Sequence, residues 1–120
     1  MMTMLNQELS GDHYSITYNA DTATVKFRGQ LVLRGYAEYT PIMHLLLKIA
    51  ATQPAAITLD LRDVLFLNSS GINMFSKFLL SLRTQKNIGL IVIGDRGIPW
   101  QAKSLKNMPK LLPRVQLILD

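Results

Sequence analysis

Short apolar runs alternate with helical patterns along this chain, and that alternation limits the folds open to it. Residues 56–61 and 88–93 have the length and apolar composition of buried strands. Between them, residues 72–83 place apolar side chains at helical spacing. Strands joined through helices pair in parallel with right-handed crossovers. The centre of the fold is therefore predicted to be a largely parallel sheet.

An opening hairpin is predicted before this centre. Residues 14–18 and 22–27 each alternate with period two, and a turn at 19–21 separates them. A helix is expected to begin between Tyr36 and Pro41, because proline is tolerated only in the first turn. It should end at Gln53-Pro54.

The second half of the chain completes the order β-β-α-β-α-β-α-β. A turn is expected near Arg62-Asp63, followed by more apolar chain up to residue 67. A short amphipathic helix is predicted from Trp100 to about Met108, and a last strand over 115–119. On the central strands we expect buried side chains, with two residues of the second helix packed on them: Ile57, Leu59, Ile91 and Ile93, and Phe75 and Leu79.

The length of 120 residues fits one domain. We predict a flexible N-terminal tail over residues 1–12 and a single α/β domain over 13–120. No apolar run reaches the roughly 20 residues that span a bilayer, and the N-terminus does not resemble a secretory signal. We therefore expect a cytoplasmic protein without membrane contact.

Motifs of catalysis are missing from the sequence. There is no cysteine, and His13 and His44 stand without a second ligand at metal spacing. Asp60 and Asp63 are the only candidate pair of neighbouring carboxylates. We interpret Asp60 as a hydrogen-bond acceptor in a turn or a helix cap and not as a general base. The Gly-x-Ser-x-Gly motif of hydrolases and the glycine-rich motifs that bind phosphates or dinucleotides are also absent. We expect no enzyme activity, no cofactor and no metal.

The positive charge is concentrated in the second half. From Lys77 to Arg114 there are eight cations and one anion, Asp95, and the net charge of the chain is +5. The spacing of three lysines predicts one exposed basic face, formed by Lys103, Lys106 and Lys110. Such a face suits an acidic partner or a nucleic acid, and it is equally consistent with a solvated surface that binds nothing.

Asn68-Ser69-Ser70-Gly71 joins an apolar run to the start of a helix. One interpretation is a helix cap, because asparagine or serine there accepts a hydrogen bond from a free backbone N–H and contributes about 1 kcal/mol. The other is a phosphoacceptor, since a phosphate at that place meets unpaired N–H groups and the positive end of the helix dipole. Capping needs only one of the serines.

Leu59-Asp60-Leu61 followed by Asn68-Ser69-Ser70-Gly71-Ile72 resembles the STAS family of bacterial anti-sigma factor antagonists, as an Asn-Ser-Ser-Gly variant. The resemblance implies a mixed sheet with helices mainly on one face. It also implies a partner-switching module, whose serine kinase is also a partner and whose phosphatase resets the serine. Ser69 then takes the place of the phosphorylated serine and Ser70 that of its neighbour. The partner-binding residues that follow from it are Asn68, Ser69, Gly71, Asn73 and Lys77.

The sequence departs from that family at three places. Asn68 and Val32 stand where many relatives carry aspartates near the phosphorylation site. The chain ends on its last predicted strand, where relatives usually add a helix, so apolar surface is left for another molecule, such as a second copy. If Ser69 is a switch, it should be exposed, with Ser70 more buried and its hydroxyl bonded to the backbone. The alternatives are a constitutive STAS-like scaffold and a basic nucleic-acid-binding accessory domain.

Overall fold

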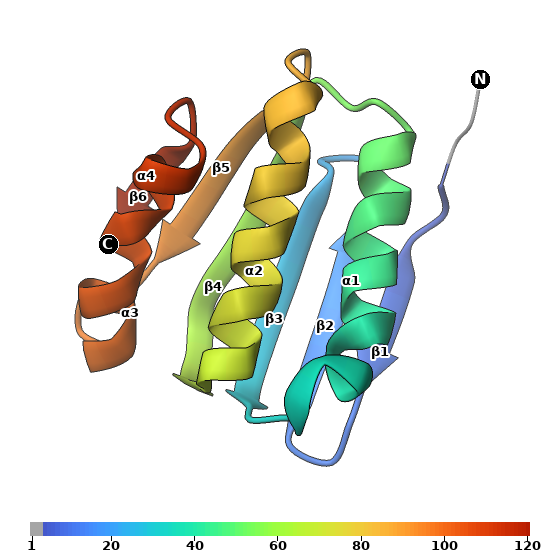
Figure 1. Ribbon diagram of the computed structural model, residues 1–120. Coiled ribbons are helices and arrows are strands. Elements are labelled where there is room, and N and C mark those ends of the chain that lie inside the picture. Colours follow the sequence, from blue (N-terminus) through green and yellow to red (C-terminus); the bar gives the residue numbers. More distant parts are fainter. Residues whose placement is uncertain (1–3) are drawn as a thin grey trace.

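The computed structural model describes residues 4–120 and contains one six-stranded sheet with strand order β1-β2-β3-β4-β5-β6 (Figure 1). The pairs β1–β2 and β2–β3 are antiparallel, and the other three neighbouring pairs are parallel. The strands are β1 (Gln7–Ser10), β2 (Tyr14–Asn19), β3 (Thr24–Leu31), β4 (Ala56–Leu67), β5 (Gly89–Gly94) and β6 (Gln116–Leu119). The predicted mixed sheet is confirmed.

The helices cover one face of this sheet, as predicted. In Figure 1, α1 (Gly35–Ala51) and α2 (Ser69–Ser81) lie side by side in front of the strands. A 3-10 turn, η1 (Leu82–Thr84), extends α2. The third helix differs from the expected continuous one: it is divided into α3 (Pro99–Ser104), the 3-10 turn η2 (Leu105–Asn107) and α4 (Met108–Leu111).

Two boundaries differ from the sequence prediction. Helix α1 begins at Gly35, one residue before the expected range of Tyr36 to Pro41, and Pro41 lies beyond the first turn, inside the helix. Strand β1 occupies part of the segment predicted to be a flexible tail. Its Leu9 is half-buried against the core and pairs with Ile16 of β2, which explains why this part of the chain is held. Residues 1–3 of the predicted tail lie outside the described residues.

The core lies between the sheet and the helices. Ile57, Leu59, Phe75 and Leu79 are buried there, as predicted. The prediction was wrong for Ile91 and Ile93, which are only half-buried. Successive strand residues point to opposite faces, so these two lie on the face that no helix covers, while Leu90 and Val92 of the same strand fill the core.

Strand β4 is longer than predicted, because the expected turn at Arg62-Asp63 is instead a register irregularity within one strand. The pairing with β5 ends at Asp60, so the rest of β4 extends beyond that neighbour. Two residues of α3 occupy the vacated side. Trp100 Nε1 donates to Val64 O at 2.8 Å, and Gln101 Nε2 donates to Leu61 O at 2.6 Å. The end of β4 therefore stays ordered up to residue 67.

The uncovered face carries an ion network around Asp60, which is buried at 5% exposure. The Arg62 side chain donates two hydrogen bonds to the Asp60 carboxylate, at 2.9 and 3.0 Å, and the Arg62 backbone N–H donates a third at 3.2 Å. Lys26 Nζ lies 3.7 Å away. Burial raises the pKa of Asp60, but the hydrogen bonds and charge of Arg62, with the charge of Lys26, outweigh it and leave the pKa below its ordinary value. The carboxylate is therefore held ionised as a structural group.

A prediction about pH follows from that lowered pKa. A carboxyl whose pKa is lower in the folded state stabilises the fold above its unfolded pKa, and this stabilisation disappears as pH falls through the folded pKa. Asp60→Asn should therefore lower the free energy of unfolding at pH 7, and the difference from wild type should shrink below about pH 4. Urea unfolding at several pH values measures it. The matched change Asp21→Asn, at an exposed turn, should show little effect at either pH; a constant Asp60→Asn deficit would contradict the ion-pair account.

Candidate functional site

Residues 61–67 of β4, beyond its pairing with β5, are called the β4 extension. Ser69 is the first residue of α2 and follows this extension closely in the chain. Its side chain is exposed, whereas Asn68 and Ser70 on either side are half-buried. This is the predicted order of exposure for the two serines. The first turn of α2 contains no acidic side chain, so the positive end of the helix dipole is not neutralised there. The hydroxyl of Ser69 is accessible at an electropositive position.

Asn68 holds this position through three neighbours. Its Oδ1 accepts from the backbone N–H of Gly71 at 3.0 Å, which caps α2, and lies 2.6 Å from the Tyr39 hydroxyl. Its Nδ2 donates to Leu33 O at 2.6 Å. One side chain thus joins the start of α2, the body of α1 and the loop after β3.

Tyr39 is the buried member of this network, with 1% exposure. Its hydroxyl also lies 2.8 Å from Leu31 O and accepts from the N–H of Leu33 at 3.3 Å. Burial raises the pKa of Tyr39 more than that N–H lowers it, so the phenol stays neutral and keeps its one proton for donation. Sequence analysis missed this residue. Its position three residues before Ile42 extends the apolar stripe of α1, which indicates burial, but nothing in the sequence indicates the contact with Asn68.

Two expectations about the motif need correction. The Ser70 hydroxyl was expected to bond to the backbone, but among residues 4–120 it has no hydrogen-bond partner, and the side chain that caps α2 is that of Asn68. Gly71 was predicted to contact a partner, but it is buried. A Cβ on Gly71 would lie 2.4 Å from Leu67 and 2.7 Å from the Tyr39 hydroxyl. Glycine is needed here for close packing under the loop, so a partner cannot touch it directly.

The other predicted partner-binding residues are exposed on α2. Asn73 lies one turn into the helix, and Lys77 one turn further. Lys77 Nζ sits 4.5 Å from the ring centre of Tyr36, which belongs to the first turn of α1. This cation–π contact links the outer surfaces of the two helices.

Exposed apolar side chains accompany the serine. Leu65 and Phe66 on the β4 extension are 52% and 58% exposed, and Val32, which follows β3, is 56% exposed. Gln30 and Leu31 of β3 pair with Phe66 and Leu67, so these chain ends lie next to each other. Tyr36, in the first turn of α1, is 65% exposed. We call the four exposed apolar residues near the starts of α1 and α2 the switch surface: Val32, Tyr36, Leu65 and Phe66. Clustered exposed apolar groups mark interaction sites.

The predicted basic residues, Lys103, Lys106 and Lys110, are all exposed. They do not follow one continuous helix, because η2 interrupts the segment between α3 and α4. Their exposure agrees with the prediction, and a binding role for them stays a prediction.

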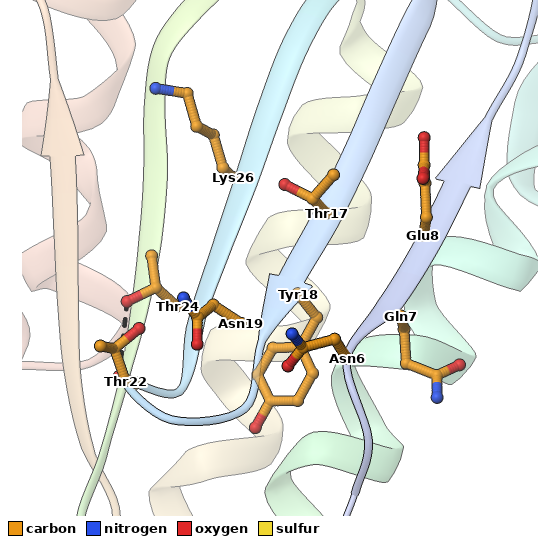
Figure 2. A pocket seen from close by; sticks show the side chains of 9 residues that line it. All are labelled: Asn6, Gln7, Glu8, Thr17, Tyr18, Asn19, Thr22, Thr24 and Lys26. Carbon is orange, nitrogen blue, oxygen red and sulfur yellow. Dashed lines mark hydrogen bonds between the residues drawn. The ribbon is translucent and has the colours of Figure 1, made fainter.

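A separate polar depression of about 620 Å³ lies on the uncovered face of the sheet, at the opposite end from Ser69. Figure 2 shows its side chains rising from β1, β2, β3 and the β2–β3 turn, with Lys26 directed toward β4. That lysine is already engaged with Asp63 at 3.2 Å. His13 and His44 are exposed and apart from this depression, and residues 4–120 hold no cluster of metal-type ligands. The depression adds nothing to the candidate site.

The fold is that of a STAS-like domain, the class of the anti-sigma factor antagonists. One such protein, from Mycobacterium paratuberculosis, superposes with a TM-score of 0.55 at 18% identity, over 93% of this chain and 84% of the other. No protein-family model and no curated protein matches the sequence.

More similar still in fold is SiaC of Pseudomonas aeruginosa, with a TM-score of 0.73 at 15% identity over 98% of both chains. A chain from the crystal structure of the diguanylate cyclase SiaD in complex with its activator SiaC, also from P. aeruginosa, gives 0.71 at 15% identity, over 95% of this chain and 99% of the other. No helix within residues 4–120 has the length and apolarity that crossing a membrane requires. At 15–18% identity, these similarities show the fold alone.

Proposed function

We propose that this protein is a non-enzymatic regulatory module that binds a protein partner through the switch surface and the start of α2, and that phosphorylation of Ser69 selects the partner. The observation that carries the proposal is the placement of an exposed serine at an unneutralised helix start, with four exposed apolar side chains near the starts of α1 and α2. Apolar groups supply binding energy, and the serine supplies a position where charge can change.

The chemistry of the switch is electrostatic. A phosphate on Ser69 adds nearly two negative charges. It would meet the free N–H groups and the positive dipole of the first turn of α2. No carboxylate is needed or present in that turn, and Asn68 fixes the local backbone. The phosphorylated form therefore keeps the fold and alters only the charge that a partner meets.

The partner that we favour is a cytoplasmic signalling protein. The similarity to SiaC covers nearly the whole of both chains, and SiaC is the activator of a diguanylate cyclase in the complex with SiaD. The alternative partner, implied by the resemblance to the anti-sigma factor antagonists, is an anti-sigma factor with serine kinase activity, and a phosphatase would then remove the phosphate from Ser69. In either case the domain contributes a surface and no reacting group.

Ser69 variants test the proposal directly. Ser69→Ala should keep the fold and abolish phosphorylation, and Ser69→Glu should change which proteins are captured from cell extract. Ser70→Ala is the matched control and should behave as wild type. Tryptic cleavage after Arg62 and Lys77 yields the peptide 63–77, in which mass spectrometry can assign the phosphate to a serine. Capture that is identical for wild type and all three variants, with no phosphate in residues 68–76, would remove the switch and leave a constitutive scaffold.

A further inference from the structure

A second binding feature lies between α2 and the broken third helix. This small apolar groove, of about 40 Å³, is lined on one side by Leu67, Ile72 and Phe75 and on the other by Trp100, Met108 and Leu111. We call it the α2–α4 groove. Its space is close to that of one water molecule in liquid, so it suits the tip of a single aliphatic side chain. Ser104 and Asn107 also line it, but nearly all of the surface that the groove exposes is apolar, which favours an apolar occupant over water.

Three exposed lysines flank lining residues of the α2–α4 groove in the sequence: Lys103, Lys106 and Lys110. Within residues 4–120, none of the three forms a salt bridge. By contrast, Arg83 and Arg114 are used internally, since they donate to the carbonyls of Leu111 and Leu82. The lysines are the cations that a partner could meet.

We propose that the α2–α4 groove binds an acidic amphipathic segment of a partner protein: an aliphatic side chain inserted between α2 and α4, with carboxylates on either side facing the lysines. Charge complementarity selects this occupant. A second copy would bring like charges together on a chain of net charge +5. The phosphates of a nucleic acid could pair with the lysines, but they would leave the apolar groove empty.

This groove connects to the switch surface through sequence neighbours of Ser69. Leu67 and Ile72, on either side of the serine, both line it. If the proposed phosphorylation occurs, the added charge lies at one end of the groove and repels an acidic segment. The inference thus rests on the proposed function for its regulation, while binding itself does not require the phosphate.

The test uses the full-length protein and a short capped peptide with a central leucine flanked by glutamates. In an NMR titration at low salt, the peptide should shift the backbone amides of Ile72, Leu105 and Met108. A peptide with serine in place of leucine should bind about tenfold more weakly, because it lacks the apolar tip that the groove would bury. Absence of these shifts, or equal binding of both peptides, would overturn the proposal. Tighter binding of duplex DNA to the same amides would replace it with the nucleic-acid alternative.

Asn107→Glu supplies a matched variant, because Asn107 is exposed and lines the groove. It should weaken peptide binding by about tenfold or more through like-charge repulsion. Asn87→Glu, at an exposed turn away from the groove, should not weaken it. If Asn107→Glu and Asn87→Glu changed peptide binding equally, the α2–α4 groove would not be the binding site.

In capture from cell extract, a partner that binds wild type and Asn107→Glu equally well would show that the α2–α4 groove is not its binding site. The proposed function would remain. A partner lost in Asn107→Glu but indifferent to Ser69→Glu would support the groove and remove the phosphorylation switch.

Discussion

Phe75→Ala should lower the free energy of unfolding by about 3–5 kcal/mol, the usual cost of removing a buried phenyl ring. Phe75 is 1% exposed and meets Phe27 of β3 edge-on, with ring centres 5.3 Å apart and planes at 72°. The ring therefore fixes α2 on the sheet. Because a domain of this size is typically stable by about 5–15 kcal/mol, the loss would be a large part of the total. Urea unfolding followed by circular dichroism measures it.

Phe66→Ala is the control, since it makes the same chemical change on the β4 extension at 58% exposure. Its effect on stability should stay within about 0.5 kcal/mol. The same variant should weaken partner capture, because Phe66 belongs to the switch surface. If both variants lost a comparable amount of stability, the Phe66 side chain would be packed in the fold and unavailable to a partner. The switch surface would then be wrong.

The central elements could be predicted because they follow one strong periodicity each. The apolar run of β4 and the helical spacing of α2 identified the sheet and placed Ser69 at a helix start. The burial of Ile91 and Ile93 could not be predicted in this way. An apolar residue stands at every position from Leu90 to Ile93, so the run does not reveal which of its two faces is covered.

Other features depend on contacts between distant parts of the chain. Strand β1 contains a single large apolar residue, Leu9, and its order comes from pairing with β2. The polar side chain of Gln101 is fully buried because Leu61 O, Val64 O and the N–H of Asp95 satisfy it. No local sequence pattern predicts a buried polar side chain of this kind. The same holds for Tyr39, whose partner Asn68 is 29 residues away.

The asparagine of the motif has a physical explanation in the structure. A carboxylate can cap a helix as well as an amide can, but it cannot donate a hydrogen bond. In this chain Asn68 Nδ2 donates to Leu33 O at 2.6 Å. An aspartate, which the resembling family carries here, would place an oxygen against that carbonyl oxygen. The loop after β3 therefore favours an amide over a carboxylate at position 68, because its Leu33 carbonyl needs a donor. The same loop contains Val32, where many STAS relatives carry a second carboxylate.

Asn68→Asp should for that reason lower the free energy of unfolding by about 1–3 kcal/mol at pH 7, the usual cost of leaving a buried polar group unpaired. The favourable interaction of a carboxylate with the dipole of α2, about 0.3–1 kcal/mol, offsets only part of it. The folded state disfavours the ionised form, so the pKa of the new carboxyl should be higher in the folded than in the unfolded state. Below that folded pKa the protonated carboxyl can donate to Leu33 O.

The deficit of Asn68→Asp should accordingly shrink as pH is lowered from 7 toward 4, because protonation of this carboxyl stabilises the fold. Protonation of a salt-bridged carboxylate such as Asp60 has the opposite effect and destabilises the fold. Urea unfolding of the variant and wild type at both pH values gives the comparison. Asn73→Asp is the matched control, because this asparagine is exposed on the same helix and its change should alter stability by no more than about 0.5 kcal/mol. If Asn68→Asp were as stable as wild type at pH 7, the Leu33 contact would not explain the asparagine. The Asn-Ser-Ser-Gly motif would then differ from the Asp-Ser-Ser-Gly form only in what a kinase or partner meets.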